Sequence, residues 1–216
     1  GIGCQWSGGA HDKCQQLADL LMVDADESSF TTHHEAHCLH LDASGSGRGT
    51  AALPNLAAHR LNEGITNISE LLEKSELVVL LTALGGGTGS GATAEIAAKS
   101  RESGSLVISI VGIPFAEQPL RCAIAEKALP PIERNSDLCI RVSLERLAWQ
   151  ARHRDSDWKL GSEWIGELIE GLVTTLARVG KINLDLMDLR TVVGRPGNAT
   201  LIVGNGTTDD PDGVVR

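Results

Sequence analysis

Short apolar runs that alternate with helical patterns dominate the middle of this chain. Apolar stretches at 77–82 and 106–112 predict strands buried on both faces, as in a parallel sheet, and 138–142 predicts one more strand. Helical spacing follows over 92–103 and over 120–135, where a Pro-Pro step is expected to disturb the second helix. This rhythm predicts an α/β fold, with a doubly wound, mainly parallel Rossmann-like sheet flanked by helices.

The patterns at the two ends of the chain are less regular. They predict, in chain order, a short helix at 11–19, a strand at 20–23, an extended segment at 30–41, helical spacing over 54–75 with a break near Gly64, a long amphipathic helix at 157–178 and a final strand at 199–204.

A glycine run links the strand at 77–82 to the helix at 92–103. The run comprises Gly85, Gly86, Gly87, Thr88, Gly89, Ser90 and Gly91. Glycines between a strand end and a helix start leave several backbone N–H groups open, and the helix dipole adds about half a positive charge there. The run therefore predicts a phosphate-binding loop.

Two common phosphate-binding motifs do not fit the chain. A Walker A loop needs Lys and then Ser or Thr after its last glycine, but Gly91 is followed by Ala92 and Thr93. The glycines at 1–9 are spaced too widely for GxGxxG, which argues against a nucleotide-dependent oxidoreductase. A flexible glycine linker is the remaining alternative, which the flanking strand and helix disfavour.

Composition narrows the class of protein further. The 216 residues suit one sizeable domain, and the net charge of −9 argues against a nucleic-acid partner. The five cysteines form no CxxC pair, and neither a signal peptide nor an apolar span long enough for membrane insertion is present. These features favour a cytoplasmic protein with reduced thiols.

The motif GGGTGSG resembles the signature of the FtsZ/tubulin superfamily of GTPases, and the resemblance extends over nearly all of the chain. It implies a GTPase-domain fold, binding of GTP and GDP with Mg²⁺, and hydrolysis of GTP. It also implies head-to-tail self-assembly into filaments in a cytoskeletal role such as cell division. A membrane adaptor or other division proteins are further expected partners.

The resemblance assigns nucleotide contacts to several further positions. Gly3, Gly8 and Gly9 resemble the first phosphate loop, with 4–7 as extra residues, and Asp26 resembles part of a short acidic turn in which Asp24 stands where Asn is usual. The remaining expected contacts are Gly45, Gly47 and Arg48 near the γ-phosphate, Pro114, Glu117 and Arg121 near the ribose, and Trp158, Ser162 and Glu163 near the base.

Base recognition rests on the start of the long helix. Trp158 would stack on the purine, and Glu163 would accept the N1–H and N2–H of guanine, which adenine does not offer. Leu144 occupies a position where the family carries an Asn near the nucleoside. For Glu117 and Arg121 an ordinary surface location is the alternative, and Arg48 could equally be solvated.

The segment after the long helix resembles the catalytic NxDxxD loop of the family, with Asn183, Asp185 and Asp188. Two carboxylates and an amide can orient a water and accept its proton. From Glu163 the helix descends about 24 Å, so the loop lies far from its own nucleotide and must act on that of a neighbouring subunit. As the alternative, Asp185 and Asp188 simply cap a helix.

The resemblance divides the chain into a GTP-binding domain over 1–180, which includes the long helix 157–178, and a segment over 181–216 with the catalytic loop, final strand and tail. We expect a fragment, because a strand should precede Gly1 and the second domain of filament-forming relatives is absent. The histidines of 33–40 are interpreted as a solvated strand, with a metal site as the alternative. The alternative function is a GTP-binding interaction module that neither cycles nor forms filaments.

Overall fold

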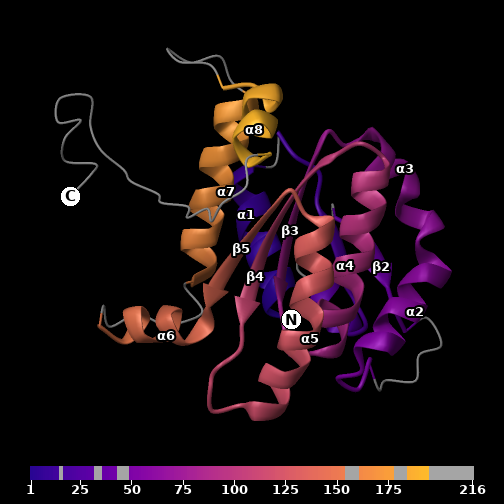
Figure 1. Ribbon diagram of the computed structural model, residues 1–216, viewed down its shortest axis with the longest axis vertical. Helices are drawn as coiled ribbons and strands as arrows, with labels where there is room; N and C mark the ends of the chain where they lie inside the picture. Colours follow the sequence, from indigo (N-terminus) through magenta and orange to yellow (C-terminus); the bar gives the residue numbers. More distant parts are fainter. Residues whose placement is uncertain (15–16, 32–35, 43–48, 154–160, 178–183, 195–216) are drawn as a thin grey trace.

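The computed structural model describes residues 1–14, 17–31, 36–42, 49–153, 161–177 and 184–194 (Figure 1). Within them, two parallel sheets form. Strand β1 (Leu21–Asp24) pairs with β2 (His37–His40), and the order β3 (Leu77–Ala83), β4 (Leu106–Ile113), β5 (Leu138–Ser143) makes the second sheet. Every ladder is parallel, as the sequence predicted, because each strand is followed by a helical crossover.

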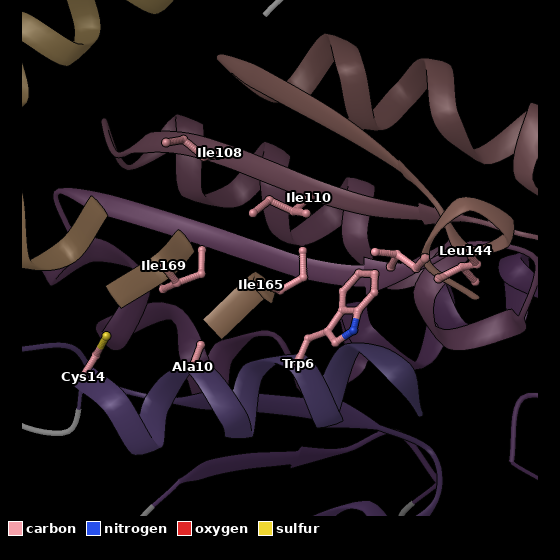
Figure 2. Packing of buried hydrophobic residues seen from close by; sticks show 9 residues of the cluster. Trp6, Ala10, Cys14, Ile108, Ile110, Leu144, Ile165 and Ile169 are labelled. Carbon is pink, nitrogen blue, oxygen red and sulfur yellow. The ribbon is translucent and has the colours of Figure 1, made fainter. Parts of the chain in front are cut away.

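Helices cover both faces of the three-stranded sheet. The helices in the described part of the chain are α1 (Ile2–Cys14), η1 (Glu27–Phe30), α2 (Pro54–Gly64), α3 (Thr66–Lys74), α4 (Gly87–Glu102), α5 (Pro119–Asn135), α6 (Leu144–His153), α7 (Gly161–Ala177) and α8 (Leu186–Val193). Figure 2 shows one face, where Trp6 of α1 and Ile165 of α7 pack with Ile110 of β4. On the other face, Val111 of β4 packs with α4 and α5. The doubly wound arrangement is therefore confirmed.

Helix α1 is the largest departure from the sequence prediction. It begins at Ile2 rather than near His11, so the glycines at 3, 8 and 9 lie inside a helix and not in a loop. Trp6, Ala10 and Cys14 are buried at a spacing of four residues, which makes one apolar helical face. Burial of this face against α7 and β4 outweighs the poor helix propensity of glycine.

Two other helices differ in detail. Helix α4 begins at Gly87, within the glycine run, so the helix start predicted at Ala92 was late. Helix α5 continues through Pro130 and Pro131 to Asn135 instead of being disturbed there. The carbonyls that lose their partners belong to Glu126 and Lys127, which are exposed, so water can satisfy them.

The burial of β3 also departs from the prediction. β4 is buried over Leu106–Gly112, as predicted for a central strand, but the equally apolar β3 is half-buried along most of its length. β4 has a paired strand on each side, whereas β3 pairs with β4 alone in the described part of the chain. The apolar side chains of β3 instead line a cavity, which leaves them half-buried.

The other predicted helix and strand boundaries agree with the structure in some places and differ in others. The break near Gly64 is confirmed by the separate helices α2 and α3. The segment at 30–41 holds the end of η1 and β2 rather than one extended stretch. Helix α6 was not predicted, and Leu144 at its start is a buried core residue. The described part of the long helix is Gly161–Ala177, and the predicted strand at 199–204 lies outside the described residues.

Candidate functional site

Two helix amino termini meet at the carboxyl ends of β1 and β3. The amino group of Gly1, just ahead of α1, donates to Oδ2 of Asp24 at 3.1 Å. At the start of α4, the Thr88 hydroxyl lies 3.4 Å from Oδ1 of Asp24 and 3.4 Å from the Thr50 hydroxyl. Helix amino termini and hydroxyl donors favour an anion, so this edge has the character of a phosphate site.

The glycine run shapes this site by permitting close packing. Gly85 has φ +92°, and a Cβ there would lie 2.7 Å from Cβ of Arg121. A Cβ on Gly87 or Gly89 would overlap Thr50 or the backbone of Ala83. The Gly85 N–H donates to the Ser90 hydroxyl at 2.9 Å, which fixes the turn from β3 into α4. The run therefore places the α4 amino terminus directly beside β3 and Thr50.

The first phosphate loop expected at Gly3, Gly8 and Gly9 needs a correction. Gly3 lies in the first turn of α1, and a Cβ there would be 3.2 Å from Cα of Thr82. Gly8 is buried five residues further along the helix, and Gly9 packs against Gly166 of α7. These two positions lie about 8 Å or more from the helix start, so they serve helix packing and not a loop.

The acidic turn places Asp24, rather than Asp26, at the centre of the site. Burial opposes the charge of Asp24, but hydrogen bonds from Ser29 and the charged Gly1 amino group outweigh it and hold the pKa of this carboxyl below its ordinary value of 3.8. Asp26 is exposed and caps η1 by accepting hydrogen bonds from the Ser28 N–H and hydroxyl. Asp24 is thus a fixed negative charge at the edge of an otherwise anion-favouring site.

The loop expected to contact a ribose follows β4. Pro114 is buried, and Arg121 lies in the first turn of α5, where it packs on Gly85 and lines the same cavity as Gly86 and Thr88. Glu117 is exposed in the turn before α5. The structure therefore brings Arg121 to the glycine run and leaves Glu117 at the surface of the loop.

Several expected nucleotide contacts are not described. Gly45, Gly47, Arg48, Trp158 and Asn183 lie outside the described residues. Ser162 belongs to α7, but only its backbone is described. Glu163 is exposed in the first turn of α7, and its expected contact with a base stays a prediction.

Asp185 and Asp188 lie at the amino end of α8 and form a reciprocal cap. The Asp188 N–H donates to Oδ1 of Asp185 at 2.8 Å, and the Asp185 N–H donates to Oδ2 of Asp188 at 3.2 Å. Arg190 of the same helix donates to the carbonyl of Gly104, just ahead of β4, at 2.6 Å. The alternative role of the two carboxylates as helix caps is therefore present in the structure.

Helix α8 consequently sits at the end of the sheet opposite to the glycine run (Figure 1). Gly104 precedes the start of β4, whereas the run follows the end of the parallel strand β3, and seven residue pairs separate the two ends. At about 3.3 Å per residue the separation is about 20 Å. Asp185 and Asp188 therefore lie far from the phosphate-like edge of their own chain.

The sequence interpretation gave no contact at the site to Thr50, and it noted Asp24 only as a member of the acidic turn. Thr50 follows a glycine-rich segment and carries no pattern of its own, so only its contact with Thr88 reveals it. Asp24 could have been found, because a carboxylate directly after a short apolar strand reaches the carboxyl edge of a parallel sheet.

Across the described ranges, no helix is long and apolar enough to span a membrane, and no three His, Cys, Asp or Glu side chains gather as metal ligands.

Comparison with known proteins gives a consistent family. Residues 9–150 match the sequence model of the family described as Tubulin/FtsZ family, GTPase domain. The chain is 28% identical to cell division protein FtsZ 1 of Archaeoglobus fulgidus over 214 residues, covering 97% of this chain and 58% of the relative. It is 30% identical to cell division protein FtsZ of Haloferax mediterranei over 217 residues, covering 96% and 57%.

Solved structures agree on the fold. An empty FtsZ dimer of M. jannaschii superposes with a TM-score of 0.75 at 22% identity, covering 90% of this chain and 58% of that one. A CetZ from Methanosaeta thermophila gives a TM-score of 0.69 at 17% identity, covering 89% and 56%. The chain spans somewhat more than half the length of these relatives. With the family match extending over about two thirds of its residues, the chain belongs to the Tubulin/FtsZ family and carries its GTPase domain.

Proposed function

We propose that this chain is the GTP-binding domain of an FtsZ-like GTPase that hydrolyses GTP to GDP and phosphate. The observation that carries the proposal is the meeting of the α1 and α4 amino termini, the glycine run and Thr88 at one sheet edge. Backbone N–H groups there would hold the phosphates, and Arg121 on Gly85 would add a positive charge.

Further residues would bind the base of the nucleotide and a cation. Trp158 would stack on the base, and Glu163 would select guanine by accepting its two donors. The hydroxyls of Thr50 and Thr88 are hard oxygen donors that fit Mg²⁺, which keeps several waters and is bound largely through phosphates. When bound, the cation would neutralise charge that develops on the phosphates.

Hydrolysis would require a second subunit. Asp185 and Asp188 lie about 20 Å from the phosphate edge of their own chain, at the opposite end of the sheet. Acting together with Asn183, they would orient water at the γ-phosphate of the next subunit in a head-to-tail assembly. Such a contact does not close on itself, so it generates a filament. We propose a cytoplasmic role in cell division for this filament, with division proteins as further partners, in keeping with the names of the relatives.

Turnover should therefore depend on protein concentration. We expect the rate of phosphate release per subunit to rise steeply with concentration at saturating GTP and to plateau once assembly is complete. Phosphate release measured beside light scattering tests this directly. A rate per subunit that is constant over a hundredfold range of concentration would contradict the shared site.

A non-cycling GTP-binding module is the second candidate function. It is favoured by the reciprocal cap of Asp185 and Asp188, which gives both carboxylates a structural role without any catalysis. Tight GTP binding with no phosphate release at any concentration would support this alternative.

Replacing Asp24 with Asn should strengthen nucleotide binding. The low pKa of Asp24 keeps the carboxylate charged at neutral pH, where it repels the phosphates. Asn keeps an acceptor for the Ala25 N–H, which now donates to Asp24 at 2.7 Å, and removes the charge. We expect Kd for GDP to fall about tenfold.

The measurement is fluorescence titration with a labelled GDP at constant ionic strength. Asp19→Asn is the matched control, because Asp19 is exposed ahead of the opposite end of β1, and it should leave Kd unchanged. Weaker binding of Asp24→Asn would contradict the prediction and would indicate that this carboxylate holds the cation.

A further inference from the structure

Arg60 lies on helix α2, which has a fixed position beside the phosphate-like edge. Ala57 and Leu61, which come before and after Arg60 in the helix, are fully buried. They belong to one apolar cluster with Ala92 and Ile96 of α4. The backbone of Arg60 is therefore fixed relative to α4, whose amino terminus forms part of the phosphate-like edge.

The guanidinium of Arg60 joins two segments that lie on either side of it in space. Its Nη1 donates to the carbonyl oxygen of Gly49 at 2.9 Å, and its Nη2 lies 3.3 Å from Oδ1 of Asp42 in an ion pair. Asp42 follows β2, and its side chain is only 2% exposed, so a nearby cation is needed to stabilise its charge. The ion pair fixes the direction of the guanidinium and, with it, the carbonyl of Gly49.

The turn that follows Gly49 is strained. Gly49, Ala51 and Ala52 have φ values of +55°, +48° and +58°. Alanine seldom adopts this left-handed region, because its Cβ approaches the following carbonyl oxygen. Both alanines are exposed, so burial of their side chains does not hold the turn. Such a backbone persists only where neighbouring contacts impose it, and the hydrogen bond from Arg60 to Gly49 is one of these contacts.

The same turn places Thr50 at the phosphate-like edge. Thr50 is buried, its hydroxyl lies 3.4 Å from that of Thr88, and a Cβ on Gly87 would overlap its side chain. The carbonyl of Thr50 accepts a hydrogen bond from the Leu53 N–H at 2.8 Å, which closes the turn. The position of the Thr50 hydroxyl therefore depends on the turn that Arg60 contacts at its start.

We propose that Arg60 is a positioning residue for the nucleotide site: paired with the buried Asp42, it holds the Gly49 carbonyl and thereby keeps the Thr50 hydroxyl at the phosphate-like edge. The effect on nucleotide binding rests on the proposed function, in which Thr50 is an oxygen donor beside the phosphates. Asp42 compensates the charge of Arg60, so Arg60 acts through Thr50 and not as a phosphate ligand.

The first test measures the turn without nucleotide. Loss of Arg60 alone would leave the buried charge of Asp42 without this cation and could unfold the chain, so the test variant is Asp42→Asn/Arg60→Met and its reference is Asp42→Asn. Asn keeps an acceptor for Arg60, whereas Met is unbranched and donates no hydrogen bond. Amide exchange of Leu53 is read by NMR, and we expect it to be at least about tenfold faster in the test variant than in the reference.

Arg101→Met is the matched control for this measurement. Arg101 also donates to a distant backbone carbonyl, that of Arg134, at 2.8 Å, but it lies in the last turn of α4, at the opposite end from Thr88. Its loss should leave exchange at Leu53 unchanged. Equal exchange at Leu53 in the test variant and its reference overturns the proposal.

The second test asks whether Arg60 acts through Thr50. Kd for labelled GDP is measured for the reference and the test variant, each with and without the additional substitution Thr50→Val, which removes the hydroxyl. We expect loss of Arg60 to raise Kd about tenfold when Thr50 is present and less than about twofold in the Thr50→Val background.

This cycle separates positioning from a purely structural role of Arg60. A structural role would weaken binding by the same factor whether or not the Thr50 hydroxyl is present, so an equal rise in both backgrounds overturns the proposal, as does no rise in either. Failure of the unmodified chain to bind GDP would instead contradict the proposed function. Exchange at Leu53 would then still confirm or overturn the contact of Arg60 as the one that holds the turn.

Discussion

Asn in place of Asp188 is expected to reduce GTP turnover at least about 100-fold while GTP binding stays within about twofold of the unmodified chain. The carboxylate is proposed to accept a proton from water that attacks the γ-phosphate of a neighbouring subunit, and an amide does not accept it. Binding is spared because Asp188 lies at the opposite end of the sheet from the phosphate edge of its own chain. Phosphate release and nucleotide titration measure the two quantities separately.

The choice of Asn separates catalysis from helix capping. Asp188 accepts a hydrogen bond from the Asp185 N–H at 3.2 Å, and the side-chain oxygen of Asn can accept the same bond. Asp188→Ala removes the cap as well, so it should lower both turnover and the stability of α8. If Asp188→Asn kept full turnover, the carboxylate would act as a helix cap only, and its proposed catalytic role would be wrong.

Gly91→Ala is expected to destabilise the fold by about 2 kcal/mol, equivalent to a fall in Tm of about 4–8 °C for a domain of this size. A Cβ on Gly91 would overlap the carbonyl oxygen of Pro54 and lie 2.9 Å from Cβ of Ala57. These atoms belong to helix α2, which packs against α4, so relief requires the two helices to separate. Alanine gains about 1 kcal/mol in helix propensity, which is less than the cost of the overlap.

Gly171→Ala provides the matched control for this prediction. Gly171 also lies inside a helix, α7, but a Cβ there would meet no atom within 4 Å. The Tm of Gly171→Ala should therefore stay the same or rise, because the substitution causes no overlap and alanine has the higher helix propensity. Thermal unfolding of both variants checks the pair. Equal Tm changes would show that the close approach of α2 and α4 is not what requires glycine at position 91.

Local sequence patterns placed a helix or strand correctly where its hydrophobic periodicity was clear. The apolar runs of β4 and β5 and the helical spacing of α5 were placed within about two residues, because burial and periodicity agree there. The same patterns placed the start of α1 nine residues late, because its glycines argue for a loop when the segment is considered alone. They also placed the start of α4 five residues late, because glycines open that helix.

The candidate site was predictable only in part for the same reason. The glycine run and Arg121 carry local signals, and the structure brings them together. Thr50 and Asp24 reach Thr88 from positions 38 and 64 residues away, and no local pattern encodes such a meeting. Their convergence depends on how the sheets and helices pack.

The sequence by itself determined the α/β class and the parallel strands, because these depend on periodicity over a few residues; the phosphate-binding character of the glycine run stays a prediction from the same sequence. Only the tertiary structure decided that α1 is helical from Ile2, that Asp24 rather than Asp26 faces the phosphate edge, and that β3 lines a cavity. Each of these depends on contacts between segments far apart in the chain, and the free energy of those contacts exceeds the local preferences that the sequence pattern reports.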